Sequence, residues 1–390
     1  MTWLLRLLPV SDPGFPPEGK VCGLTLALRL ALAAQAGGAT SVEVSPDAEF
    51  LLPLLKDPRL RIPVRVAAID PGTEDKATLR VEVPWNLVVH RDLFKDLAQH
   101  GGTGVRNLLA EPHEFHPPFA FEPMVVRDRR AKSLAERALL RSLRKLQDGW
   151  TSTYLNRYIS LFLTRWLTYV PIRPNQLSLA ILAVGLFGAY LASRGTYWPV
   201  VARAFLFQAQ SVLDGCDGEL SRVTYRGSHA GEWLDTVGDD LTNYAFFAGL
   251  AWGLHAVSGS VIYLVAGGLV VGCGVIASGI EYRYLIKIGS GDLLKYPLGI
   301  GKAPSKEGDK GRLARMLDAV SPLFKRDTFV FLTLLGAAAG LAGPFLFVFA
   351  AGGIGILVAV VRADLVPETP PPSPSPLTGE GEPAAEVRGN

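Results

Sequence analysis

The stretch that decides the fold begins at residue 214 and reads Asp214-Gly215-Cys216-Asp217-Gly218-Glu219-Leu220-Ser221-Arg222, followed by Gly231, Asp235 and Asp239. Spacings of three and four residues place Asp214 with Asp217, and Asp235 with Asp239, on single faces of two helices. Two helix ends can therefore direct four carboxylates at one point. Close carboxylates repel one another where the dielectric constant is low, so they take up protons or bind cations. All-oxygen ligands favour Mg²⁺ or Mn²⁺ over Zn²⁺, and the pattern predicts a divalent-metal site.

Apolar segments surround this stretch and predict a membrane domain. Six follow one another, at about 176–193, 197–213, 236–254, 260–281, 328–342 and 344–361. Several are shorter than the roughly 20 residues that an upright span needs. Six spans place both termini on one side, and Lys and Arg concentrate in 127–173 and 283–326. The positive-inside rule then predicts a multi-pass protein of the inner (cytoplasmic) membrane, in contact with lipids, with termini and carboxylates facing the cytoplasm.

The chain divides into four parts. Residues 1–125 alternate helical patterns with β-rich runs at 41–44, 64–69 and 79–83, which indicates an α/β domain. Residues 126–173 form a basic linker with interfacial helices, residues 174–362 hold the six spans, and 363–390 are predicted to be disordered. We therefore expect an α/β N-terminal domain joined to an all-α six-helix transmembrane bundle.

Two segments leave alternatives open. The charged helix at about 127–146 either lies on an anionic membrane surface or is a solvated linker, whereas the amphipathic stretch 154–170 suits the membrane interface. Arg203, inside the second apolar segment, either faces the bundle interior or snorkels outward.

Composition argues against several classes of protein. The formal charge is only +3, with basic residues beside apolar segments, so nucleic acid is not an expected partner. Cys22, Cys216 and Cys273 are far apart, which indicates neither a disulfide framework nor a zinc site and fits a reducing cytoplasm. His113 and His116 lie beside two prolines and are read as loop residues, not as a metal pair. The apolar start of the chain is soon broken by prolines, which argues against a signal peptide.

The carboxylate pattern resembles the CDP-alcohol phosphotransferase signature, D-x2-D-G-x2-A-R-x8-G-x3-D-x3-D, at every position except that Ser221 replaces Ala. The resemblance covers about residues 150–362. It implies a membrane enzyme that moves a phospho-alcohol group from a CDP-linked donor to an acceptor hydroxyl and releases CMP. It also implies a homodimer.

Residue roles follow from this resemblance. Asp214, Asp217 and Asp235 would hold one Mg²⁺ or Mn²⁺ ion, and Asp214, Asp235 and Asp239 would surround a second. Asp239 would also be the general base. The CDP moiety would lie against Gly218, Arg222 and Gly231.

Two further matches are shorter. Residues 174–178, Pro-Asn-Gln-Leu-Ser, resemble the family's entry to the first span, which would place Asn175 near the nucleotide; the alternative is an ordinary helix start. Lys325 and Arg326 open the fifth segment and would bind an acceptor phosphate; the alternative is a cytoplasmic anchor.

Residues 148–160 and 213–219 look most like the branch of di-myo-inositol phosphate phosphate synthases, which implies a CDP-inositol donor. Such proteins can carry a cytidylyltransferase domain in front. Here the Gly-rich phosphate loop is absent and Asn86 stands where a metal-binding Asp is expected, so residues 1–125 are read as a noncatalytic nucleotidyltransferase-like domain or an unrelated α/β domain. The rival functions are a phospholipid synthase that uses CDP-diacylglycerol, and a noncatalytic membrane scaffold. The acceptor is a polyol phosphate or a lipid.

Overall fold

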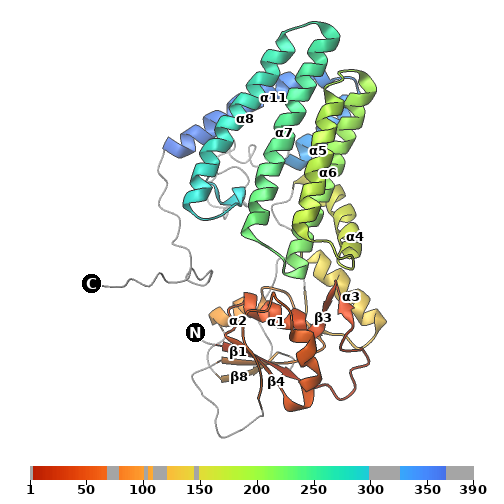
Figure 1. Ribbon diagram of the computed structural model, residues 1–390, viewed down its shortest axis with the longest axis vertical. Coiled ribbons are helices and arrows are strands. Elements are labelled where there is room, and N and C mark those ends of the chain that lie inside the picture. The colour runs from red at the N-terminus through yellow and green to blue at the C-terminus, as the bar shows by residue number, and fades with distance from the viewer. Residues whose placement is uncertain are drawn as a thin grey trace, which may run out of the picture.

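The computed structural model describes residues 3–67, 79–100, 104–108, 121–144, 149–297 and 326–365. An α/β domain and a helical domain are stacked end to end, with two short helices between them (Figure 1). Several predictions lie outside the described residues: the roles of Lys325, His113 and His116, and the disorder of the tail from residue 366.

The α/β domain is built on a parallel sheet of five strands in the order β5-β4-β1-β6-β8. The strands are β1 (Trp3–Leu8), β4 (Ser41–Val44), β5 (Val64–Val66), β6 (Leu79–Pro84) and β8 (Gly104–Asn107). Three of them coincide with the β-rich runs of the sequence. In β1, β4 and β6 apolar residues are buried, including Leu5, Val42 and Val81, because these strands pack against the core of the domain. The predicted α/β class is confirmed.

Helices cover this sheet, and a short antiparallel strand pair forms a separate two-stranded sheet. The covering elements are α1 (Leu26–Ala36), the 3₁₀ helix η1 (Pro46–Leu55) and α2 (Leu93–His100). The strand pair is β7 (Leu87–Val88) with β9 (Met124–Val125). Asn86, which precedes β7, is fully buried; its side-chain amide donates to the Val126 carbonyl at 3.3 Å, and the Val126 amide donates back to the Asn86 carbonyl at 2.9 Å.

The helical domain follows the apolar segments of the sequence. Within the described residues its long helices are α5 (Pro174–Ala192), α6 (Tyr197–Thr224), α7 (His229–Ser258), α8 (Ile262–Lys287), α10 (Arg326–Ala338) and α11 (Ala342–Leu365). Of these, α5, α8 and α11 are long and apolar enough to cross a membrane. Helices α6 and α7 carry the signature charges, and α10 has only 13 residues. The bundle thus contains helices that can cross a membrane. That it crosses the membrane six times stays a prediction.

Helix boundaries differ from the expected ones where the carboxylates lie. Helix α6 runs to Thr224, beyond the predicted end at 213, and α7 starts at His229, before the predicted start at 236. The apolar pattern stops early at both places because the signature residues are polar. The four carboxylates therefore lie inside helices and not at their tips. Helix α11 likewise continues to Leu365, three residues into the segment that was predicted to be disordered.

Arg203 of α6 faces the bundle interior. Its side chain is fully buried, with the guanidinium carbon 4.9 Å from the ring centroids of both Phe207 and Phe246. These cation–π contacts compensate part of the cost of removing the charge from water. Of the two alternatives for Arg203, the interior one is confirmed.

Between the two domains lie α3 (Arg129–Arg141), the π-helical turn η2 (Ser152–Asn156) and α4 (Arg157–Leu167). Helix α4 has an exposed face with Tyr158, Phe162 and Trp166 at four-residue spacing. Its opposite face, with Ser160 and Thr164, is buried. The predicted amphipathic helix is confirmed, and its place at the membrane interface stays a prediction.

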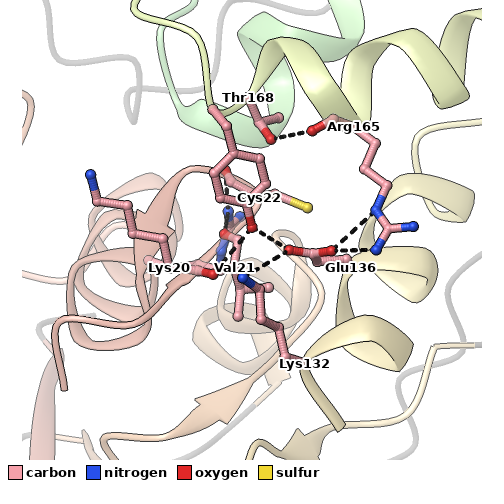
Figure 2. A network of polar contacts seen from close by, with 9 residues as sticks. Lys20, Val21, Cys22, Lys132, Glu136, Arg165 and Thr168 are labelled. Atoms are coloured by element: carbon pink, nitrogen blue, oxygen red, sulfur yellow. Dashed lines mark hydrogen bonds and ion pairs between the residues drawn. The ribbon is translucent and has the colours of Figure 1, made fainter. Parts of the chain in front are cut away.

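A buried carboxylate joins α3 to α4. Arg165 donates from Nε and Nη2 to Glu136 at 3.2 and 3.0 Å, and the Tyr169 hydroxyl donates to the same carboxylate. Figure 2 shows the Arg165 guanidinium directed at Glu136, with Cys22 beside the pair. Burial raises the pKa of the Cys22 thiol to about 12, so this side chain stays protonated at neutral pH. The connecting helices are thus tied to the α/β domain and to each other.

Candidate active site

Helices α6 and α7 bring three of the four signature carboxylates together. Asp214, Asp217 and Asp235 each offer an oxygen, and these oxygens all lie within 4.8 Å of one another. Asp239, one turn further along α7, lines the same small cavity. The convergence predicted from the spacing is found.

The short connection between α6 and α7 brings the carboxylates of the two helices together. Helix α6 ends where Tyr225 adopts the left-handed conformation, with φ of 54°, and the Tyr225 amide donates to the Ser221 carbonyl. Helix α7 begins at the N-cap residue Ser228, whose hydroxyl accepts from the Gly231 amide at 3.0 Å. The chain reverses over about four residues, so Asp217 and Asp235 face each other across the turn.

Ser178 of α5 orients one carboxylate. Its hydroxyl donates to Asp217 Oδ2 at 2.5 Å and is also within 3.2 Å of the Pro174 carbonyl. The sequence singled out Ser178 only as part of the entry to the first apolar helix. The contact adds α5 to the elements that build the carboxylate cluster.

Arg326, the first residue of α10, lies among the carboxylates. It donates from Nη1 to Asp214 Oδ2 at 3.2 Å and to Asp239. The next residue, Asp327, accepts from the Ser152 amide at 2.6 Å, which fixes the start of α10 against the turn before α4. Arg326, predicted to bind an acceptor phosphate, is therefore placed beside the predicted general base.

The residues predicted to hold the nucleotide line a larger cavity of about 540 Å³ next to the cluster. Its walls include Asn175, Gly218, Arg222 and Gly231, together with Asp217 and Asp235. A Cβ atom on Gly231 would lie 2.8 Å from Asn175 Oδ1, so a larger residue would displace that amide. The structure thus brings all four predicted nucleotide contacts into one space that opens onto the carboxylates.

The donor set fits a divalent cation. Three carboxylates with oxygens this close suit a hard ion that takes oxygen ligands, and without one they would repel each other. Asp239 lies outside this group of three, and its carboxylate, like that of Asp214, is paired with Arg326. A second ion that used Asp239 would require this ion pair to open.

Glu219 lies on α6 beside the carboxylates, and no role was predicted for it from the sequence. It is fully buried one turn from Cys216, and it accepts from Arg157 Nη1, the Ser160 hydroxyl and the Thr164 hydroxyl, each at 2.7 Å. These partners fix α4 against α6 beside the carboxylates. The signal in the sequence was an acidic residue in an apolar environment, which requires a partner.

Comparison with known proteins agrees with this geometry. Residues 172–286 match the family model described as CDP-alcohol phosphatidyltransferase. A "Bifunctional IPC transferase and DIPP synthase" of Aquifex aeolicus is 33% identical over 132 residues, which is 31% of this chain and 30% of that protein. The protein of the same name from Archaeoglobus fulgidus is 35% identical over 104 residues, 27% of this chain and 20% of that protein. The chain thus spans less than a third of the length of these relatives.

One similar solved structure is the Mycobacterium tuberculosis phosphatidylinositol phosphate synthase with CDP-DAG bound. It has a TM-score of 0.39 to this chain and 18% identity, over 53% of this chain and 94% of that chain. The same enzyme in complex with manganese and citrate has a TM-score of 0.36 and 19% identity, over 53% of this chain and 88% of that chain.

Proposed function

We propose that this chain, whose residues 172–286 form a CDP-alcohol phosphatidyltransferase domain, is an integral membrane CDP-alcohol phosphotransferase. It would move a phospho-alcohol group from a CDP-linked donor to an acceptor hydroxyl and release CMP. The observation that carries this proposal is the meeting of Asp214, Asp217 and Asp235 within 4.8 Å, beside a cavity large enough for a nucleotide.

The carboxylates supply the metal ligands. Asp214, Asp217 and Asp235 would hold one Mg²⁺ or Mn²⁺ ion, and Asp214, Asp235 and Asp239 a second. Bound there, such ions would contact the donor's diphosphate and stabilise the charge that develops as CMP leaves.

Asp239 is the proposed general base. As the acceptor oxygen forms its bond to the β-phosphorus of the donor, the bond from that phosphorus to CMP breaks, and the hydroxyl proton passes to the Asp239 carboxylate. Arg326 is the first residue of α10 and pairs with Asp239. An acceptor phosphate could replace Asp239 as the partner of the Arg326 guanidinium. In this scheme binding of the acceptor frees the base.

The larger cavity would hold the nucleotide. Arg222 provides a planar guanidinium suited to phosphate oxygens, and Asn175 provides an amide that can both donate and accept. Gly218 and Gly231 leave room for the ligand along the two helices.

CDP-inositol is the proposed donor, because the matched relatives carry names that couple an IPC transferase with a DIPP synthase. The rival donor is CDP-diacylglycerol. The acceptor is proposed to be a polyol phosphate, with a lipid as the alternative.

The α/β domain is proposed to lack cytidylyltransferase activity. Asn86 stands at the carboxyl end of β6, beside the point where strand order reverses and where such sheets bind ligands. Its side chain is fully buried and bonded to Val126, which is a poor arrangement for a metal ligand. Production of a CDP-alcohol from CTP by an Asp217→Asn variant would contradict this proposal.

Two further properties are proposed from the sequence. The termini and the carboxylate cluster would face the cytoplasm, and the protein would form a homodimer. Labelling of single cysteines placed at each terminus, with a membrane-impermeant reagent, tests the first, and light scattering in detergent tests the second.

The deciding experiment measures CMP release by the purified full-length chain in lipid. Mg²⁺ is added after chelation, CDP-inositol and CDP-diacylglycerol are compared, and polyol phosphates are supplied as acceptors. Asp217→Asn is the inactive control. Release from CDP-inositol supports the proposal, release from CDP-diacylglycerol alone makes the protein a phospholipid synthase, and no release from either donor favours the scaffold function.

A further inference from the structure

The α/β domain contributes the side chain of Arg91 to the lining of the larger cavity. Arg91, in the turn between β7 and α2, lines this cavity together with Tyr225 and Arg226 of the α6–α7 connection. Its side chain is 40% exposed and its Nε lies 3.5 Å from an Asp92 oxygen. A cation from the α/β domain therefore faces the same space as Asp217, Asp235 and Arg222.

Two other arginines hold the end of α6 to the α/β domain. Arg29 of α1 donates from Nη1 to the Val223 carbonyl at 2.9 Å, and Arg59 donates from Nη1 to the Thr224 carbonyl at 2.7 Å. The last carbonyls of a helix have no partner within the helix and carry partial negative charge. Both arginines satisfy these groups, so the helix that carries Asp214 and Asp217 is capped by the other domain.

The junction is also packed. Val223 belongs to the same buried cluster as Val21 and Cys22, so the core of the α/β domain continues into the end of α6. Gly23, with φ of +77°, lies so close to the end of α4 that a Cβ atom would be 2.1 Å from the Thr168 carbonyl oxygen. The polar contacts of Figure 2 fix the same end of α4. The α/β domain is therefore packed against the ends of α4 and α6, next to the cavity that Arg91 lines.

Arg91 lies at the end of the cavity formed by the α6–α7 connection. It lines the cavity together with Tyr225 and Arg226, which follow the end of α6. Thr224, the last residue of α6, is seven residues beyond Asp217, about 10 Å along the helix axis. A diphosphate bound at the carboxylates would leave the nucleoside to extend along α6 toward Arg91.

We infer that Arg91 contacts the nucleoside half of the CDP-linked donor, and that the α/β domain is thereby a donor-recognition element of the membrane transferase. A guanidinium can donate to the carbonyl and ring nitrogen of a pyrimidine base or stack on its face. Arg29 and Arg59 are positioning residues, because they hold the α6 end against which the donor would lie. This inference rests on the proposed function and deepens it.

The test is direct binding of CMP, measured by calorimetry on the full-length chain in lipid nanodiscs with Mg²⁺. Arg91→Ala is expected to weaken CMP binding about tenfold or more, because a charge-assisted contact is lost. Arg91→Lys should restore part of the affinity. Arg65→Ala, an exposed arginine on the edge strand β5, is the matched control and should bind CMP as the wild type does.

Kinetics separate contact from general damage. Arg91→Ala should raise KM for the donor with little change in kcat, whereas loss of kcat alone would overturn the inference. Equal CMP affinity in Arg91→Ala and wild type would also overturn it while leaving the proposed function intact. Failure of the wild type to bind CMP at all would overturn both.

Arg59 tests the positioning role. Arg59→Ala should weaken CMP binding severalfold, and Arg59→Lys, which keeps a charged donor for the Thr224 carbonyl, should recover most of it. Equal weakening in both variants would remove Arg59 from the inference.

Discussion

The guanidinium of Arg326 donates to the carboxylate of Asp239, although the two residues lie 87 positions apart in the sequence. The same nitrogen reaches Asp214 at 3.2 Å, so one arginine compensates two of the four signature carboxylates. A divalent ion shared by Asp214 and Asp239 would use the same oxygens. Arginine and metal are therefore alternative partners for this part of the cluster.

Replacement of Arg326 should make folding more dependent on metal. In Arg326→Gln, Asp214 and Asp239 lose their cation, so the chelated protein should unfold at a lower temperature than the wild type. Addition of Mn²⁺ should raise the unfolding temperature more in the variant than in the wild type, because the carboxylates are free to bind it. Thermal unfolding in detergent, with chelator and then with Mn²⁺, measures both shifts.

The control for this experiment is Arg283→Gln, which removes an exposed ion pair between α8 and Asp364 of α11 that includes none of the signature carboxylates. It should unfold like the wild type with and without metal. A Mn²⁺-induced shift in Arg326→Gln no larger than that of the wild type would contradict competition between arginine and metal.

Asp217→Asn and Asp239→Asn should both abolish CMP release while leaving the protein folded, for different reasons. Asp217 lies in the group of three close carboxylates, so its loss should weaken Mn²⁺ binding, whereas Asp239→Asn should keep the first ion and lose the base. Mn²⁺ titration followed by paramagnetic resonance, alongside CMP release, distinguishes them. Near-normal turnover in either variant would refute the assignment, and Asp364→Asn should behave as wild type.

Loss of Glu219 should destabilise the helical domain strongly. Its carboxylate is the partner of the buried Arg157, and removal of one member of a buried pair typically costs about 3–5 kcal/mol. Glu219→Ala should therefore lower the unfolding temperature by many degrees, and Glu219→Gln by less, because its amide oxygen can still accept from one of the two hydroxyls, that of Ser160 or that of Thr164. Glu49→Ala, an exposed residue of η1, is the control. Equal stability of Glu219→Ala and wild type would show that Arg157 finds another partner.

Local patterns explain which parts of this molecule could be predicted. Helical spacing predicted that Asp214 shares a helix face with Asp217, and Asp235 with Asp239, because neighbours on one helix face depend only on the period of the helix. The strands at 41–44 and 79–83 followed from short β-rich runs in the same way. These features are encoded within a few turns of chain.

The partners of these residues could not be predicted, because they come from distant segments. Arg326 reaches Asp214 across 112 positions, and Arg29 reaches Val223 across 194. Such contacts depend on how whole helices pack, and a single sequence contains no direct record of that packing. The second apolar segment was predicted to end too early for a related reason. The hydropathy falls where the polar signature residues begin, whereas the helix continues to Thr224.

His90 should make the folded state less stable in mild acid. Burial lowers its pKa below the usual 6.5, although Asp92 partly opposes this, so the unfolded chain takes up the proton more readily. His90 therefore does not reduce the free energy of unfolding above about pH 6.5. That free energy falls as the pH drops below this value toward the folded-state pKa of His90. His90→Gln should lose less stability than the wild type between pH 7 and pH 5.5, measured by urea unfolding monitored by tryptophan fluorescence. Parallel pH profiles for the two proteins would show that His90 is protonated equally in both states.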